Sequence, residues 1–175
     1  ATSELFNRYK DENWIKIAEK ATYFPWVFLT AGISLGAAWS YEVLGWGGYW
    51  AWDPVENVSF IPWLLATAFL HSSKTQIKEK TLINWNYVLA CLMFISVIFG
   101  TFITRSGVLI SVHAFSNGNI GTYLLIGLLI FTFLFMYIGI KNIEYFKTSR
   151  KVENIFGRSG FFAVSYTHLT LPTNG

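Results

Sequence analysis

Long apolar runs alternate with short polar segments along this chain. Four such runs cover residues 23–43, 54–71, 82–104 and 121–140. Each is close to the length of a helix that crosses the hydrocarbon core of a bilayer, which needs about 20 residues. The pattern therefore predicts an all-α, polytopic membrane protein with about four transmembrane helices, connected by short loops.

The segments that flank the predicted transmembrane region, residues 23–140, differ in character. Residues 1–22 are polar and mixed in charge, which predicts a cytoplasmic or interfacial segment. Residues 141–164 are basic and then turn apolar, as at the start of a further span. Residues 165–175 fit neither a span nor a charged anchor, and the first methionine is Met93. We expect a fragment of a longer protein, with a truncated or foreign tail.

The composition agrees with a membrane protein. Of 175 residues, 53% are hydrophobic, 19% aromatic and only 13% charged. Every lysine and arginine except Arg105 falls in three segments on one side of the predicted bundle, which are residues 1–22, 72–81 and 141–158. Cytoplasmic loops carry the excess of positive charge. The loop over residues 44–57, Arg105 and His113 are therefore predicted on the outer, periplasm-like side.

The loop over residues 44–57, here called the aromatic loop, concentrates unusual residues. It reads WGGYWAWDPVEN from Trp46 to Asn57, with three indoles in seven positions and two glycines that keep the backbone thin. Contiguous exposed indoles would leave a large apolar patch in water, whereas Trp favours the membrane–water boundary. The loop is either an interfacial belt or a flat platform for a flat apolar ligand. Its candidate ligand-binding residues are Trp46, Gly47, Gly48, Trp50 and Trp52.

The aromatic loop leads into a helix with a recognisable start. Asp53 is predicted as the N-cap and Pro54 as the first helical residue, with Glu56 reaching back to complete a capping box. The helix is predicted to reach His71, an axial length of roughly 27 Å at 1.5 Å per residue. One stripe of this helix connects the loop with the histidine. The residues of the stripe are Glu56, Phe60, Trp63, Thr67 and His71.

Small residues repeat at every fourth position of the first predicted span, at Gly32, Gly36 and Ser40. Such a stripe lets a neighbouring helix approach closely in a membrane. Ordinary helix packing is therefore the preferred interpretation of these positions.

The histidines and Arg105 each have two interpretations. An ionisable residue inside a membrane span is a functional candidate by default, but His71 can also serve as an interfacial residue at the helix end. His113 lies in an apolar-flanked outer loop, which taken alone favours an ordinary surface histidine. Arg105 can pair with an acidic group of a ligand or extend its side chain to the interface.

Haem is the ligand that these residue types would suit. It is a large, planar, apolar macrocycle with two carboxylates and an iron atom that takes an axial nitrogen. Indole faces match the ring, an imidazole matches the iron, and Arg105 matches a propionate. Asp53 and Glu56 are interpreted as capping residues first.

Two blocks carry a family resemblance. WGGYWAWDPVEN resembles the tryptophan-rich "WWD" signature of the haem-handling proteins of cytochrome c maturation. The continuations SFIPWLLATAFLHS and GTFITRSGVLISVHAF are similar to the CcmF/NrfE branch and not to the CcsA branch. The resemblance extends from about residue 39 to residue 117.

The resemblance implies roles for individual residues. The residues of the aromatic loop that would hold incoming haem on the outer face are Trp46, Gly47, Gly48, Trp50, Trp52, Asp53, Pro54 and Glu56. His113 matches a histidine that ligates the iron of that haem, and His71 matches a histidine that ligates a resident b-type haem in the membrane. The second histidine of each pair would lie outside this chain.

The resemblance also implies a reaction, a location and partners. Two cysteine thiols of a Cys-x-x-Cys-His apocytochrome c would add to the haem vinyl groups, in the manner of a haem lyase. The sequence offers no evident acid or base for this, so we expect a contribution through positioning. The implied location is the bacterial inner membrane, with the aromatic loop in the periplasm. The implied partners are apocytochrome c, a haem chaperone and other maturation proteins, and no nucleic acid.

Two other functions stay open on the residues alone. A b-type haem electron-transfer subunit would use His71 but needs a second membrane histidine. A multi-pass transporter of small solutes would use the aromatic loop as a gate. Two features argue against a transporter. The spans carry few charges, and the only predicted break in a helix is the kink at Pro62, whereas transporter sites are typically formed by a pair of broken helices.

Overall fold

The computed structural model describes residues 13–44, 48–109 and 119–143. Within these residues all regular structure is helical, which confirms the all-α prediction. The helices are α2 (Asn13–Leu44), α3 (Pro54–Glu79), α4 (Ile83–Ser106) and α5 (Ile120–Lys141).

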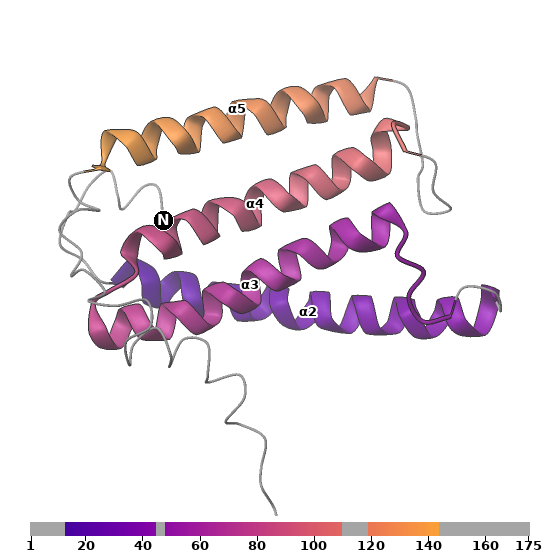
Figure 1. Cartoon of the computed structure of the whole chain (residues 1–175), viewed down its shortest axis with the longest axis horizontal. Helices are drawn as coiled ribbons and strands as arrows, with labels where there is room; N and C mark the ends of the chain where they lie inside the picture. Colours follow the sequence, from indigo (N-terminus) through magenta and orange to yellow (C-terminus); the bar gives the residue numbers. More distant parts are fainter. Residues whose placement is uncertain (1–12, 45–47, 110–118, 144–175) are drawn as a thin grey trace, which may run out of the picture.

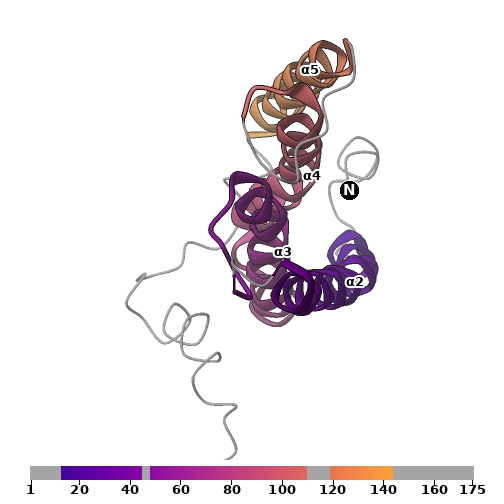
Figure 2. The ribbon, with the colours of Figure 1, turned by 90° about the vertical axis from the view of Figure 1, so that its right-hand side faces the viewer.

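The four helices lie side by side in chain order, and neighbours run in opposite directions (Figure 1). Each packs on the next along the chain, α2 on α3, α3 on α4 and α4 on α5. Viewed from the end, the row is curved, with α2 turned to one side of α3 (Figure 2). The described part of the aromatic loop and the end of α4 therefore share one end of the bundle, and the α3–α4 turn lies at the other.

Among the described residues, three helices are long and apolar enough to cross a membrane: α2, α4 and α5. The predicted second span falls in α3, which is long enough but not apolar enough to be counted with these three helices. Charged residues at both ends and polar residues along its length lower its hydropathy. Because α3 lies between α2 and α4, protein covers several of these polar side chains where lipid would not satisfy them.

α3 is also longer than the apolar pattern predicts. The pattern ended this span at His71 and placed a loop over residues 72–81, whereas the helix continues to Glu79. Its C-cap, Lys80, takes a left-handed conformation with φ 58°, and the Lys80 N–H donates to the Gln76 carbonyl at 2.9 Å. The predicted loop is therefore corrected to a short turn between α3 and α4.

A buried polar network explains the extension of α3. Asn86 of α4, with an exposed fraction of 0%, lies against Ser72 and Gln76 of α3. The Asn86 Nδ2 group donates to Gln76 Oε1 at 2.7 Å and to the Ser72 carbonyl at 3.2 Å, and Asn86 Oδ1 accepts from the Ser72 hydroxyl. Buried polar groups with partners are compatible with a packed helix. The apolar pattern alone placed Ser72 and Gln76 in a loop, because both side chains are polar.

α2 begins at Asn13, ten positions before the predicted first span at Tyr23. Its first turn is anchored because Trp14 and Ile15 pack in a buried cluster with Phe69 and Leu89. The remaining two helices begin and end within two residues of the predicted spans 82–104 and 121–140.

Candidate functional site

The start of α3 has the predicted capping box. Asp53 Oδ2 accepts from the Val55 N–H at 3.0 Å, and Glu56 Oε2 accepts from the Asp53 N–H at 3.4 Å. Pro54 occupies the first helical position, where no N–H is required. The three residues therefore fix where the aromatic loop ends and in which direction α3 leaves it.

The first turn of α3 also holds the backbone of the loop. Glu56 Oε2 accepts a second hydrogen bond, from the Ala51 N–H at 2.9 Å, and Asn57 Nδ2 donates to the Trp52 carbonyl at 3.1 Å. Between these bonds Trp52 has φ 59°, the left-handed region that bulky residues rarely occupy. The Trp52 side chain is 76% exposed. The loop thus presents an uncovered indole on a restrained backbone.

A row of aromatic rings leads from the loop into the seam between α2 and α3. The Trp50 ring meets Trp52 edge-on at 6.3 Å and Phe60 edge-on at 5.7 Å between centroids. Phe60 stacks on Trp63 at 5.2 Å, and Trp63 stacks on Trp26 of α2 at 6.3 Å. These contacts place part of the predicted stripe against α2.

Below the rings, two tryptophan–threonine pairs bridge α2 and α3 reciprocally. The Trp26 indole donates to the Thr67 hydroxyl at 2.8 Å, and the Trp63 indole donates to the Thr30 hydroxyl at 2.8 Å. Each hydroxyl donates in turn to the carbonyl of the tryptophan four residues earlier in its own helix, Thr67 to Trp63 and Thr30 to Trp26. All four side chains are thereby satisfied, as part-buried indoles require.

Sequence reasoning missed Trp26, Thr30 and Asn57. A signal for the first two exists, because the spacing Trp-x-x-x-Thr occurs at Trp26–Thr30 and again at Trp63–Thr67. In antiparallel helices such matched pairs can face each other. No comparable signal marks Asn57, whose bond depends on the fold of the loop.

His71 lies one turn beyond Thr67 and is half-buried. Its Nδ1 atom is 2.7 Å from the Thr67 carbonyl oxygen. Since a carbonyl only accepts, Nδ1 carries a proton, and in the neutral imidazole the lone pair is then on Nε2. This is the tautomer of a metal-ligating histidine whose other nitrogen is held by the backbone. His71 lies about 26 Å from Pro54 along α3, at 1.5 Å per residue.

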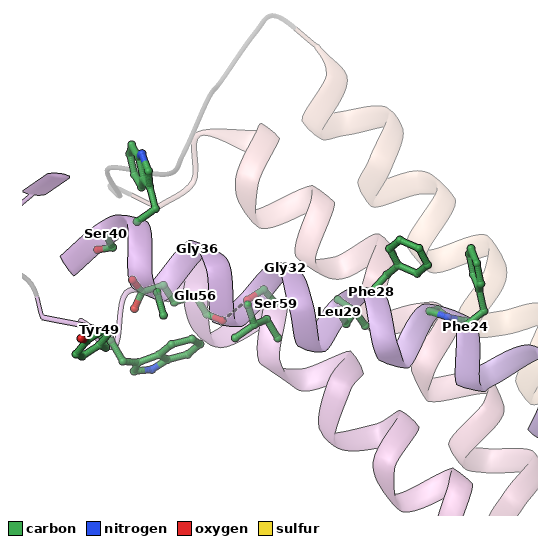
Figure 3. A pocket seen from close by; sticks show the side chains of 14 residues that line it. Phe24, Phe28, Leu29, Gly32, Gly36, Ser40, Tyr49, Glu56 and Ser59 are labelled. Atoms are coloured by element: carbon green, nitrogen blue, oxygen red, sulfur yellow. Dashed lines mark hydrogen bonds between the residues drawn. The ribbon is translucent and has the colours of Figure 1, made fainter. Parts of the chain in front are cut away.

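An apolar groove of about 710 Å³ runs along α2 below the aromatic loop. Phe24 and Phe28 lie toward one end and Tyr49 at the other, with Gly32 and Gly36 between them (Figure 3). Glu56 and Ser59 reach the groove from α3. We call it the α2 groove.

The small-residue stripe of α2 borders this groove. Among the described residues, nothing lies within 4 Å of a Cβ added at Gly32 or Gly36. The packing partner expected for the stripe is therefore not found in the described part of the chain, and the stripe instead keeps the groove open.

Arg105 is exposed near the end of α4, at the same end of the bundle as the aromatic loop. It lines a second cavity of about 290 Å³ together with Val55 and Val58 of the first turn of α3. A cation is thus available beside the start of α3.

Several candidate residues are not brought together. Trp46, Gly47 and His113 lie outside the described residues, and Gly48 is described with φ 64°, which glycine adopts without strain. His71 lies far along α3 from the loop. In the described part of the chain, no group of three or more His, Cys, Asp or Glu side chains could hold a metal ion.

Comparison with known proteins identifies the family to which this chain belongs. Residues 3–110 match the model of the cytochrome C assembly protein family. Cytochrome c-type biogenesis protein CycK of Rhizobium meliloti is 46% identical over 132 residues, which cover 75% of this chain and 20% of the relative. CcmF of Haemophilus influenzae is 47% identical over 126 residues, covering 71% of this chain and 19% of the relative.

NrfE of Haemophilus influenzae, also a cytochrome c-type biogenesis protein, is 52% identical over 101 residues, covering 58% of this chain and 16% of the relative. The chain thus spans about a fifth of the length of the curated relatives it matches. No solved structure matches it. The family match covers more than half of the chain, and the chain belongs to the cytochrome c assembly protein family, in its CcmF/NrfE branch.

Proposed function

We propose that this chain is part of a membrane component of c-type cytochrome biogenesis that holds haem on its aromatic loop for attachment to apocytochrome c. Family membership and the names of the relatives support the pathway. The observation that carries the haem-holding role is the restrained, exposed Trp52, whose ring contacts Trp50, a residue that lines the apolar α2 groove.

The described residues fit haem as a substrate. The ring is flat and apolar, and indole faces and an apolar groove of about 710 Å³ suit it, since ligand sites commonly measure about 300–1,000 Å³. Arg105, at the same end of the bundle, is the proposed partner of a propionate. His113 stays the proposed ligand of this haem iron on the strength of the family resemblance.

His71 is the proposed ligand of a resident b-type haem. The bond from His71 Nδ1 to the Thr67 carbonyl leaves Nε2 available to iron, which supports this role. A second histidine from another part of the full-length protein would complete the pair.

In the proposed reaction, each of two cysteine thiols adds across a haem vinyl group, forming a thioether while its proton passes to the vinyl carbon. Asp53 and Glu56, the acids of the described loop, are both engaged with backbone N–H groups. The proposed contribution of this chain to a haem lyase is therefore to orient the haem edge toward the thiols, which can supply a large rate factor. Apocytochrome c, a haem chaperone and other maturation proteins are the proposed partners, at the inner membrane.

The test uses the full-length protein, purified with its haem and assayed in cells for c-type cytochromes. We expect His71→Ala to remove the b-type haem absorbance, His113→Ala to reduce haem held at the loop, and both to abolish cytochrome formation. Lys78→Ala, an exposed change on α3 about two turns beyond His71, is the control and should change neither readout.

Other outcomes identify other functions. Loss of haem in His71→Ala with unimpaired cytochrome formation would favour a b-type electron-transfer subunit, which the His71 tautomer also suits. A wild-type protein that never carries haem would contradict both.

A further inference from the structure

Trp52 is held in its unusual conformation by hydrogen bonds to three backbone groups of residues 51–53. The Ala51 N–H and the Asp53 N–H both donate to Glu56 Oε2, at 2.9 and 3.4 Å, and the Trp52 carbonyl accepts from Asn57 Nδ2 at 3.1 Å. Residues in sparsely populated backbone regions persist only where the surroundings over-determine them, and they cluster at functional sites. Here the restraint on Trp52 comes from two side chains in the first turn of α3.

Helix capping alone does not account for the geometry of Glu56. A capping box requires only that the acid accept from the N–H of the cap residue. In this chain that bond, to Asp53, is the longer one, and the shorter bond goes to Ala51, two residues before the cap. Asn57 has no part in a capping box, yet it bonds the loop. Both side chains therefore serve the aromatic loop as well as the helix.

We propose that Glu56 and Asn57 are positioning residues that fix the backbone of Trp52 and so aim its indole at the haem. This inference rests on the proposed function and deepens it. An indole ring stabilises a bound flat ligand best when the ring is already oriented before the ligand binds. A binding site is most precisely ordered when rigid helices or strands support it. The first turn of α3 is such an element, because Asp53 and Pro54 fix its start.

Glu56 lines the α2 groove, but the inference assigns it an action on haem that passes through Trp52, because its Oε2 atom accepts from two backbone N–H groups of the loop. Glu56→Gln keeps a side-chain carbonyl oxygen that can accept both bonds, whereas Glu56→Ala removes the acceptor. Asn57→Asp keeps the shape of the side chain and removes the N–H donor.

The test measures amide exchange of the loop and haem retention in the full-length protein. In Glu56→Ala we expect the Ala51 amide to exchange at least about tenfold faster, and haem at the loop to bind about tenfold more weakly, as for loss of a hydrogen bond to a charged group. Asn57→Asp should weaken haem binding similarly, and Glu56→Gln should restore most of both readouts. Glu79→Gln, at the far end of α3, is the matched control.

The outcomes are distinguishable. If Glu56→Ala leaves both amide exchange and haem binding unchanged, the positioning role is wrong. If Glu56→Gln binds haem as poorly as Glu56→Ala while its Ala51 amide stays protected, the charge of Glu56 acts on the ligand directly and the inference is overturned. If the wild-type protein carries no haem, the proposed function fails, while amide exchange still reports whether Glu56 restrains the loop. Should Glu56→Ala unfold α3, Asn57→Asp decides.

Discussion

The side chain of His71 is bonded to Thr67, a residue that also bonds another helix through its hydroxyl. The Trp26 indole of α2 donates to the Thr67 hydroxyl, and the Thr67 carbonyl accepts from His71. The same hydroxyl is bonded to the Trp63 carbonyl one turn earlier. Thr67 therefore contributes both to the packing of α2 on α3 and, through its carbonyl, to the environment of a candidate iron ligand.

This arrangement predicts an energetic coupling between Trp26 and Thr67. Trp26→Phe keeps an aromatic ring and removes the indole donor, and Thr67→Val removes the hydroxyl. We expect each to lower the free energy of unfolding by about 1 kcal/mol, because the partner is left unsatisfied in a part-buried seam. In the double variant the losses should fall short of their sum by about 0.5–1 kcal/mol. Unfolding of the purified protein in detergent measures the cycle.

Trp85→Phe is the control for these variants. Trp85 is 55% exposed on α4, so its replacement should change stability by less than about 0.5 kcal/mol. Strictly additive losses in the cycle would show that Trp26 and Thr67 do not depend on each other.

At this scale the sequence predicts local chemistry and misses pairing across helices. The capping box of Asp53 and Glu56 follows from a spacing of three, because both partners lie in one turn. Trp26 and Thr30 escape notice because their partners, Thr67 and Trp63, lie more than 30 positions away. The register of α2 against α3 decides that contact. The repeated Trp-x-x-x-Thr spacing marks the residues that can pair, but the spacing alone does not fix the register.

The bounds of a helix were predictable where contact with lipid or solvent alone determines its pattern of apolar and polar residues. α4 and α5 match the predicted spans closely because both are apolar along most of their length. α3 was misjudged beyond His71 because its polar residues there are paired with Asn86 of α4. A one-dimensional hydropathy profile treats a satisfied buried polar group and a solvated one alike.

The start of α5 is predicted to be intolerant of any side chain. A Cβ added at Gly121 would lie 2.8 Å from the Ser106 Cα atom of α4 and 3.0 Å from its Cβ. Because backbone must move to relieve this clash, Gly121→Ala should destabilise the protein by about 1–3 kcal/mol. Thermal unfolding in detergent is the measurement.

Gly127→Ala is the matched control on the same helix. Among the described residues, nothing lies within 4 Å of a Cβ added at Gly127, and alanine is the better helix former. This variant should therefore be as stable as wild type or slightly more so. Equal stability of the two variants would show that α4 and α5 do not approach as closely at Gly121 as the structure has them.

The whole molecule has two chemically different ends. Tyr49, Trp52 and Arg105 lie at one end of the bundle, and Lys80 and Lys141 lie at the other, where α3 and α5 finish. Since positive charge gathers on the cytoplasmic side of membrane proteins, the aromatic loop is predicted to face outward, where haem and apocytochrome c would meet. This orientation follows from the alternating directions of the helices, which bring the end of α4 to the same side of the bundle as the aromatic loop.

Cysteine labelling in intact cells tests this orientation. With Cys91→Ala as background, Tyr49→Cys should react with a membrane-impermeant maleimide added outside, because Tyr49 is exposed in the loop. Lys78→Cys should react only after the inner membrane is permeabilised, because it lies near the lysine-rich end. Val97→Cys, exposed on the membrane-spanning part of α4, should resist labelling until detergent is added. Labelling of Lys78→Cys but not of Tyr49→Cys from outside would place the loop in the cytoplasm. It would thereby contradict the proposed attachment of haem on this face.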